Sequence, residues 1–511
     1  AYVSAASETV ARDAIRAIKV DYEVLPHFVR EDKIEKAGAR ARAAGEQVTG
    51  DPDQAFKDAE VTNEGDYGIP VITHCCLEPH GNVIQWKGDD INYWPSTQNV
   101  SGVGGDLARS LSVPGEKIHV QMDHIGGGFG AKFPSDRWGS ESAQLSKGAG
   151  GKPVRVYLDR AQELTIAGVR PSHFAKIKLA AKKDGTITGW ISESRSTGGF
   201  TGGGMAPLPY VFTNIPNKRL NHTAVSVNAG GARAWRAPNH PQASFLTCAA
   251  IDDLAAKLNM DPVEVFRKNV QWTPRAEVYQ RQLTKAAEMI EWKKLWHPRG
   301  QGDKGTLRRG VGVGINTWGG LGHASKCLVK IRKDGVVEVM MGTQDLGTGT
   351  RTCVTQVVAE TMGVPMSLVE VKIGDNAYPA SGASGGSTTI GGVSASSRRT
   401  SVDALEKLFE AVAPQLGVPK DQLEAVDSSI RAKGNPEKSI SWKAACAKLG
   451  DSGLSAENAF NPKDPQGMAS QGVGGVQMAD VTVDIETGVV KMNKLVAVQD
   501  CGLIVNPKTA E

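Results

Sequence analysis

The first candidate for chemistry is a run of glycines, Gly126-Gly127-Gly128-Phe129-Gly130, which follows the alternating apolar stretch Ile118–Met122. Because glycine has no Cβ, backbone N–H groups in such a run can approach an anion or a polar ring closely. A glycine-rich turn that binds nothing is the alternative for this run taken alone. The run is not a dinucleotide fingerprint, since no helix with the required spacing and acidic partner follows it.

Two further segments carry clustered small donors. Gln344–Thr350 leads directly into an apolar helical pattern, so its backbone amides and threonine hydroxyls could cradle an anion, or could simply cap the helix. Pro379–Thr389 is rich in serine, threonine and glycine, and by itself would pass for a flexible loop. Three such clusters in one chain favour a shared ligand.

Two other segments contain ligand or cation types. His74–His80 carries histidines, cysteines and a glutamate, but their spacing matches no standard zinc site, so a zinc enzyme built on His74 and Cys76 is a minor alternative. Arg233–Asn239 places two arginines around Trp235, an arrangement that suits a surface pair or a phosphate clamp.

The elements that must position these segments point to an α+β fold with large antiparallel sheets. Alternating strands flank turns at Lys183-Asp184-Gly185, Lys333-Asp334-Gly335 and Glu486-Thr487-Gly488, as in β-hairpins. Between them, apolar residues at helical spacing predict amphipathic helices around residues 251–258, 354–362 and 402–412.

The bulk composition bounds the function. A chain of 511 residues predicts two or more domains, and 59 glycines indicate many tight backbone positions. With a net charge of only +4 and no basic stripe, we expect no nucleic-acid partner. No apolar stretch is long enough for a membrane span, and none of the 7 cysteines has plant-type iron–sulfur spacing.

Polar connections suggest the domain boundaries. The chain opens with a helix capped at Ser7 and a predicted strand over Val20–Val24, and residues 40–64 suit a connection. A second polar, glycine-rich stretch covers 298–309. We therefore predict the end of a small N-terminal α/β domain over residues 1–50, a large domain over 51–300 and another over 301–511.

In this order, the segments resemble the large subunit of the molybdenum hydroxylases of the xanthine dehydrogenase and aldehyde oxidase type. The resemblance spans nearly the whole chain, and it rests on the following segments: Ser96–Asn99, Gly126–Lys132, Ala234–Arg236, Asp345–Gly349, Ser384–Thr389 and Val490–Pro507. It implies two large mixed molybdopterin-binding domains, preceded by the remnant of a small hammerhead-like domain. It also implies a molybdopterin, in its cytosine dinucleotide form in many bacteria, held by loops rather than by protein ligands to the metal.

The resemblance also assigns roles to single residues. Gln98 resembles the glutamine that hydrogen-bonds a molybdenum ligand, with Phe129 beside the metal, and Arg236 resembles a pterin-phosphate arginine. Thr348 stands where the family often has glutamine, and Phe133 stands where the purine enzymes have a substrate-binding glutamate. The full set of cofactor-binding residues that the resemblance implies is Gln98, Gly127, Gly128, Phe129, Gly130, Arg236, Gly347, Thr348, Gly349, Ser384 and Ser387.

The implied reaction is hydroxylation of an aldehyde or an apolar N-heterocycle, rather than xanthine, with water as the oxygen source. The family's general-base glutamate lies in a Gly-Glu segment beyond Glu511, so we expect the base on a further chain or segment. We also expect a [2Fe–2S] subunit and an FAD subunit or another electron acceptor as partners.

The alternative hypothesis for the function is that the chain is a non-catalytic relative that binds a pterin or nucleotide. We expect a bacterial cytoplasmic location, with the periplasm as the alternative.

Overall fold

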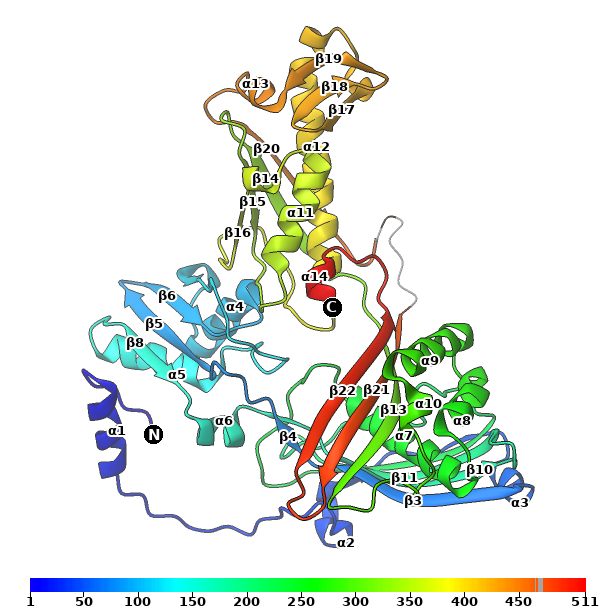
Figure 1. Cartoon of the computed structure of the whole chain (residues 1–511). Helices are drawn as coiled ribbons and strands as arrows, with labels where there is room; N and C mark the ends of the chain where they lie inside the picture. Colours follow the sequence, from blue (N-terminus) through cyan, green and yellow to red (C-terminus); the bar gives the residue numbers. More distant parts are fainter. Residues whose placement is uncertain (465, 467–471) are drawn as a thin grey trace.

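The computed structural model describes residues 1–464, 466 and 472–511. Three parts, each with its own hydrophobic core, surround a central region where the C-terminal helix lies (Figure 1). We call them the base, the side lobe and the upper lobe. The chain crosses between them several times, so each lobe sends loops toward the centre. This mixture of helices and largely antiparallel sheets confirms the predicted α+β class.

The base is a helical layer between two sheets. In the first sheet, β11 and β12 are parallel and the other pairs antiparallel. Buried side chains of both sheets meet the helices in one continuous core. The first sheet comprises β1 (Ala41–Ala43), β2 (Gln47–Thr49), β3 (Val61–Ile69), β10 (His173–Ala181), β11 (Ile187–Ser196) and β12 (Asn217–Val225). The helices are α7 (His240–Lys257), α8 (Pro262–Asn269), α9 (Ala276–Ile290) and α10 (Trp292–Leu295), and the second sheet comprises β13 (Leu307–Trp318), β21 (Val473–Asp484) and β22 (Val490–Asp500).

The side lobe is a small sheet covered by two helices. Its strands follow the order β7-β6-β5-β8, and only β6 and β7 are parallel. The loops that leave β6 and β7 run toward the centre of the molecule. The elements are β5 (Gly81–Lys87), β6 (Asp90–Pro95), β7 (Ile118–Val120), β8 (Val154–Tyr157), α4 (Val100–Leu111) and α5 (Asp136–Gly148).

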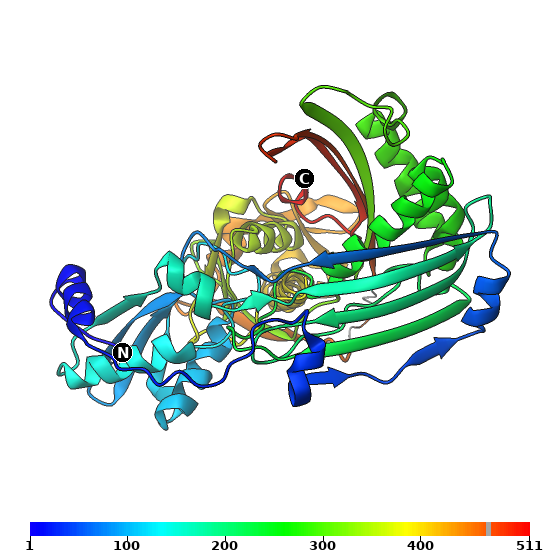
Figure 2. The ribbon, with the colours of Figure 1, turned by 90° about the horizontal axis from the view of Figure 1, so that it is seen from below.

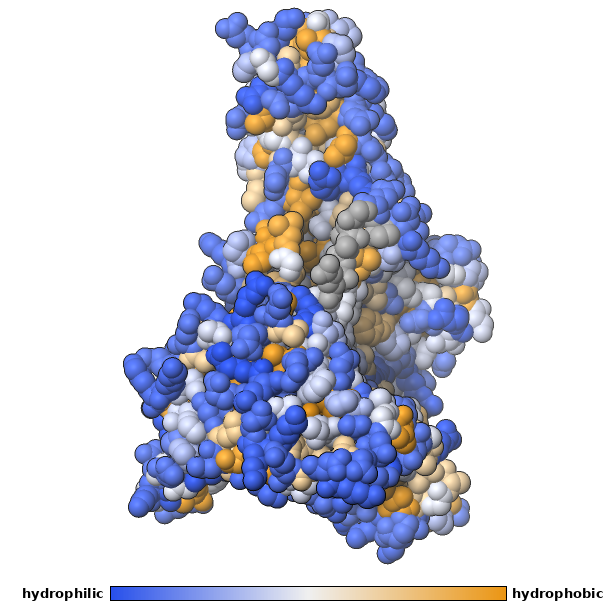
Figure 3. Space-filling view, turned by 90° about the vertical axis from the view of Figure 1, so that its right-hand side faces the viewer, coloured by the Kyte–Doolittle hydropathy of each residue, from blue (hydrophilic) through white to orange (hydrophobic). Residues whose placement is uncertain are grey.

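The upper lobe stands on the centre and carries a small three-stranded tip. Its main sheet follows the order β16-β15-β14-β20, and helices α11 and α12 pack against it. Seen from the right of Figure 1, hydrophobic residues gather at the bottom of this lobe, next to the grey residues (Figure 3). The elements are α11 (Thr350–Met362), α12 (Thr389–Leu416), α13 (Trp442–Cys446), β14 (Ser325–Ile331), β15 (Val337–Met341), β16 (Val369–Ile373), β17 (Leu423–Val426), β18 (Ser429–Ala432), β19 (Asn435–Ser441) and β20 (Leu454–Phe460).

Short elements connect these parts. Helix α1 lies outside the side lobe, and the extended chain after it runs along the base (Figure 2). Helix α14 ends the chain at the centre. The short elements are α1 (Glu8–Ala17), α2 (Ile34–Ala37), α3 (Pro52–Lys57), α6 (Arg160–Ile166), α14 (Pro507–Ala510), β4 (Ile72–Thr73) and β9 (Val169–Arg170).

The predicted hairpins β10–β11, β14–β15 and β21–β22 are confirmed, as are helices α7, α11 and α12 and the cap of α1 by Ser7, which accepts the Val10 amide. The predicted strand over Val20–Val24 is wrong, because these residues are exposed and pair with no described strand. The prediction of a mere connection over residues 40–64 is also wrong. This stretch forms β1, β2, α3 and the start of β3, and Asp51 caps α3 by accepting the Gln54 amide.

The three-part division of the chain stays a prediction. Residues 41–49 share a sheet with β12, and the base core continues across residue 300 into β13. Residues that are close in the sequence therefore do not always share a hydrophobic core in this fold.

Candidate cofactor-binding site

Gln98 joins the side lobe to the upper lobe at the centre of the molecule. It lies just before α4 and is only 2% exposed. Its side-chain oxygen Oε1 accepts the amide of Gly130 at 2.8 Å and the amide of Lys132 at 3.3 Å, while Nε2 donates to the Ser384 carbonyl at 2.8 Å. The Ser384 amide in turn donates to the Gln98 carbonyl at 2.8 Å. One buried side chain thus ties the glycine run to the serine-rich segment.

The glycine run adopts a backbone that few residues other than glycine can adopt. Gly127, Phe129 and Gly130 have φ values of +92°, +53° and +112°. A Cβ on Gly130 would overlap the carbonyl oxygen of Ala234, and a Cβ on Gly128 would overlap the Gln98 side chain. The run therefore needs its glycines, both for the left-handed backbone and for close approach to its neighbours.

Arg236 completes the site from the base. Its amide donates to the Phe129 carbonyl at 2.7 Å, and its guanidinium lies over the Phe129 ring at 5.5 Å. Both side chains are exposed at this centre, Phe129 by 40%. The structure thus brings Gln98, Phe129 and Arg236 together although they are far apart in the sequence.

A second, buried arginine lies behind Arg236. Arg170 is 6% exposed, stacks over Trp235 at 4.8 Å and donates to the Arg236 carbonyl at 2.9 Å. Burial, followed by repulsion from Arg236, lowers the pKa of Arg170 to about 10. Neither arginine pairs with a carboxylate in the part of the chain that the structure describes. This region therefore carries uncompensated positive charge and favours an anion.

The Gln344–Thr350 segment is closed by its own carboxylate. Asp345 accepts the amides of Gly347, Gly349 and Arg351 at 2.9, 3.2 and 3.1 Å, immediately before and within the first turn of α11. The amides of Gly347 and Gly349 are therefore engaged within the segment, and Thr348 is its exposed tip. The other face of Gly349 lies against Thr509 of α14.

The serine-rich segment adjoins Gln98. Ser384 is buried, and its hydroxyl accepts Gln344 Nε2 at 2.5 Å, while Ser387 is exposed with φ +59°. A Cβ on Gly385 would come within 2.7 Å of the Phe133 ring, so Phe133 faces this segment. Contacts thus link Gln98, Phe129, Gly130, Arg236 and Ser384, whereas no contact among the described residues joins Gly347–Gly349 or Ser387 to them.

Sequence reasoning missed Arg170, and it gave no individual role to Gln344 or Asp345 although both lie in the Gln344–Thr350 segment that it singled out. Gln344 accepts the Val100 amide at 3.0 Å and binds Ser384, so it is a second link between the lobes. Arg170 gave no signal because an isolated arginine in a strand is usually exposed. Asp345 could have been found, because aspartate two residues before glycine is typical of a side chain that accepts nearby amides.

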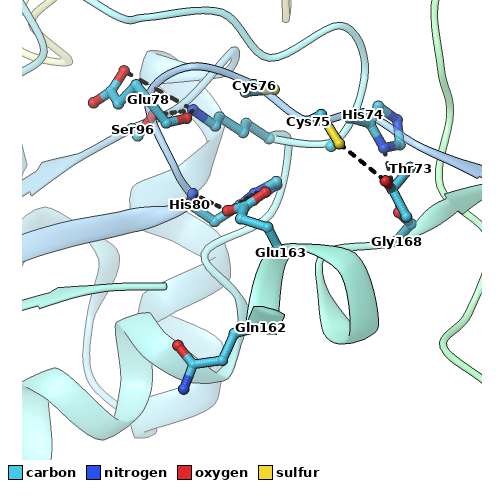
Figure 4. A network of polar contacts seen from close by, with 12 residues as sticks. Thr73, His74, Cys75, Cys76, Glu78, His80, Ser96, Gln162, Glu163 and Gly168 are labelled. Carbon is cyan, nitrogen blue, oxygen red and sulfur yellow. Dashed lines mark hydrogen bonds and ion pairs between the residues drawn. The ribbon is translucent and has the colours of Figure 1, made fainter. Parts of the chain in front are cut away.

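The histidines of the His74–His80 segment already form hydrogen bonds with other parts of the chain (Figure 4). His74 Nε2 lies 2.8 Å from the Ala234 carbonyl, and the buried His80 ring pairs with Glu163 at 2.9 Å. Among the described residues, no group of three or more histidine, cysteine, aspartate or glutamate side chains could hold a metal ion. The zinc alternative built on His74 and Cys76 therefore has no structural support.

The arrangement suits a flat, polar, anionic molecule bound by loops. Arg236 and Arg170 supply positive charge, the glycine run allows close backbone approach, and an exposed aromatic ring offers a flat surface. Separately, no helix in the described part of the chain is both long and apolar enough to cross a membrane.

Comparison with known proteins identifies the domains. A molybdopterin cofactor-binding domain matches residues 35–270, and a second domain of the same description matches residues 285–511. The molybdenum-binding subunit of an aldehyde oxidoreductase from Escherichia coli is 30% identical over 482 residues, which cover 90% of this chain and 63% of that subunit. A xanthine dehydrogenase molybdenum-binding subunit from Escherichia coli O157:H7 is 27% identical, over 100% of this chain and 72% of the subunit.

Solved structures share the fold. Quinoline 2-oxidoreductase from Pseudomonas putida 86 superposes with a TM-score of 0.82 at 21% identity, covering 99% of this chain and 71% of that chain. The Cu,Mo-CO dehydrogenase superposes with a TM-score of 0.80 at 23% identity, covering 98% and 72%. The chain thus spans 63% of the length of the aldehyde oxidoreductase subunit that it matches.

Proposed function

Because the chain belongs to the molybdopterin cofactor-binding family, as a molybdenum hydroxylase large subunit, we propose that it binds molybdopterin between its lobes and oxidises a small organic substrate. The observation that carries this proposal is the meeting of Gln98, the Gly126–Gly130 run and Arg236 beside uncompensated positive charge. We propose further that the cofactor is the cytosine dinucleotide form.

Different residues of this site would hold different parts of the cofactor. Arg236 contacts a phosphate by a charge-assisted hydrogen bond, and Arg170 adds positive charge from behind. Gln98 Nε2 has two hydrogens, of which Ser384 takes one, so the second is left for a cofactor atom. When bound, the cofactor supplies molybdenum and its redox chemistry, while the protein supplies orientation and polarity.

We propose an aldehyde or an apolar N-heterocycle as the substrate class. Phe133 can neither donate nor accept hydrogen bonds to a purine edge, which argues against xanthine. The names of relatives include both classes: an aldehyde oxidoreductase subunit at 30% identity and a nicotine 6-hydroxylase large subunit from Paenarthrobacter nicotinovorans at 25%, but also a xanthine dehydrogenase subunit at 27%. The choice of substrate class therefore rests on Phe133. A turnover screen in which xanthine exceeds aromatic aldehydes and pyridine-type compounds would reject this choice.

The general base and the electron acceptors are proposed to lie outside this sequence. Glu78, whose carboxylate contacts the glycine run, accepts the Gly126 amide and faces Lys132, so it is not a free base. A glutamate on a further segment or chain would then serve as the general base. An iron–sulfur subunit and an FAD subunit would accept the electrons. We place the assembly in the bacterial cytoplasm.

Metal analysis tests the proposal. We expect native protein to contain about one molybdenum per chain, and we expect extraction to release a pterin. The Arg236→Ala variant removes a contact worth about 1.5–3 kcal/mol, so its molybdenum content should fall about tenfold or more. Native protein without molybdenum, or a variant with unchanged content, would favour a non-catalytic pterin- or nucleotide-binding relative.

A further inference from the structure

An ion pair between the buried Lys132 and the partly exposed Glu78 holds the glycine run at both of its ends. Glu78 accepts the Gly126 amide through its carboxylate, and its own amide donates to the Gly126 carbonyl at 3.3 Å. At the other end of the run, Lys132 Nζ donates to the Glu78 carbonyl at 2.7 Å and lies 3.9 Å from the Glu78 carboxylate. A single residue, Glu78, is thus bonded to the residues that begin and follow the run.

We propose that Lys132 and Glu78 are positioning residues that fix the Gly126–Gly130 run in the conformation that receives the cofactor. The inference rests on the proposed function, because that function supplies the cofactor that the run receives. The way the run is held rests on contacts within this chain. Neither residue is proposed to touch the substrate.

The position of Lys132 is unusual for a lysine. It is 1% exposed, and its ammonium donates to Ser96 Oγ at 2.7 Å as well as to Glu78. A fully buried ammonium is costly unless it is paired, so a neutral side chain of the same length would fill this space with less desolvation. Burial lowers the pKa of Lys132, and the Glu78 carboxylate opposes that shift. The Glu78 carboxylate thus favours the charged form of Lys132.

The glycine run needs such support, because its backbone is strained. Phe129 has a left-handed backbone at φ +53°, which is unfavourable for a residue other than glycine. Such a conformation persists only where the surroundings hold it. Gln98 holds the middle of the run through Gly130, and the pair holds its ends. The orientation of Phe129 toward Arg236 follows from these contacts.

A fully buried pair, His80 and Glu163, lies beneath the Lys132–Glu78 pair (Figure 4). The His80 ring and amide both bond to the Glu163 carboxylate, and both residues are at most 2% exposed. This pair fixes the chain two residues after Glu78. The Glu163 carboxylate also acts on Lys132 electrostatically. Loss of the lysine charge would therefore leave the Glu78 carboxylate without its cation close to the strained run.

Hydrogen exchange of the full-length chain tests the mechanism without any assay of turnover. In Lys132→Met, which keeps the volume and removes the charge, we expect amides in a peptide spanning residues 126–132 to exchange at least tenfold faster. Glu78→Gln keeps an oxygen for the Gly126 amide, so its effect should be smaller. The double variant should exchange more slowly than Lys132→Met alone, because it removes the uncompensated carboxylate.

The control is Arg309→Met, which breaks an ion pair to the 2% exposed Asp480 far from the run. It should leave exchange in residues 126–132 unchanged. In holoprotein, the molybdenum EPR signal should change in Lys132→Met and return toward wild type in the double variant. Unchanged exchange in both single variants, or no rescue by the double variant, would overturn the inference. Wild-type protein without molybdenum would instead overturn the proposed function.

Discussion

Two glycine-rich segments that look alike in sequence are built in opposite ways. The Gly347–Gly349 turn is closed by Asp345, a residue of the same turn. The Gly126–Gly130 run is shaped by residues far away in sequence, namely Glu78, Gln98 and Arg236. The first is therefore a local structure that the upper lobe carries by itself, whereas the second depends on contacts between the side lobe and the base.

Alanine substitutions at matched glycines should show this difference most strongly. Gly130→Ala combines a φ of +112° with overlap of the Ala234 carbonyl, so we expect a loss of about 4 kcal/mol and of most bound molybdenum. Gly347→Ala has a φ of +87° but open space around its Cβ, so we expect only about 1–2 kcal/mol. Denaturant unfolding and metal analysis measure both. Equal losses would break the comparison.

The Gln98→Leu substitution should cause the next largest loss of stability. It leaves the Gly130 amide and the Ser384 carbonyl without their buried partner, at about 1–3 kcal/mol each, so we expect a loss of about 3 kcal/mol. Gln54→Leu, at an exposed glutamine, is the control and should change stability by less than about 0.5 kcal/mol. A Gln98 variant as stable as this control would show that the lobes do not depend on that link.

Asp345→Ala should affect only the local turn. It removes the acceptor of the Gly347, Gly349 and Arg351 amides, and a single hydrogen bond to a charged group contributes about 1.5–3 kcal/mol. Hydrogen exchange should rise in residues 345–351 and stay unchanged in residues 126–132. If both segments loosen together, the turn is not the independent unit described above.

The smallest effect is a loss of stability at acidic pH. It arises in the base, the part of the molecule that positions Arg236 beside the run. Burial, together with the stacked His222, lowers the pKa of His173 to about 3, against 6.5 for an ordinary histidine. Below pH 6.5 the unfolded chain gains a proton that the folded chain refuses, so stability falls as pH falls. The loss reaches about 2 kcal/mol at pH 5. The same slope in His173→Gln would show that this histidine is not responsible.

The helices and hairpins, which depend on local sequence, could be predicted, whereas the contacts between distant segments could not. Turn residues between alternating strands predicted β10–β11, and apolar spacing predicted α12. Residues 41–49 were missed because short, largely exposed strands at a sheet edge carry no apolar alternation. The resemblance supplied Gln98 and Arg236, whereas the contacts made by Glu78, Lys132 and Arg170 could not be predicted because they join segments that are distant in the sequence.

A structure of natively purified protein with its own cofactor tests the central claim most directly. We predict one molybdopterin in contact with Phe129, with Gln98 Nε2 within hydrogen-bonding distance of a cofactor atom and Arg236 on a phosphate. A cofactor bound elsewhere, with the Gly126–Gly130 run left open to solvent, would contradict the account.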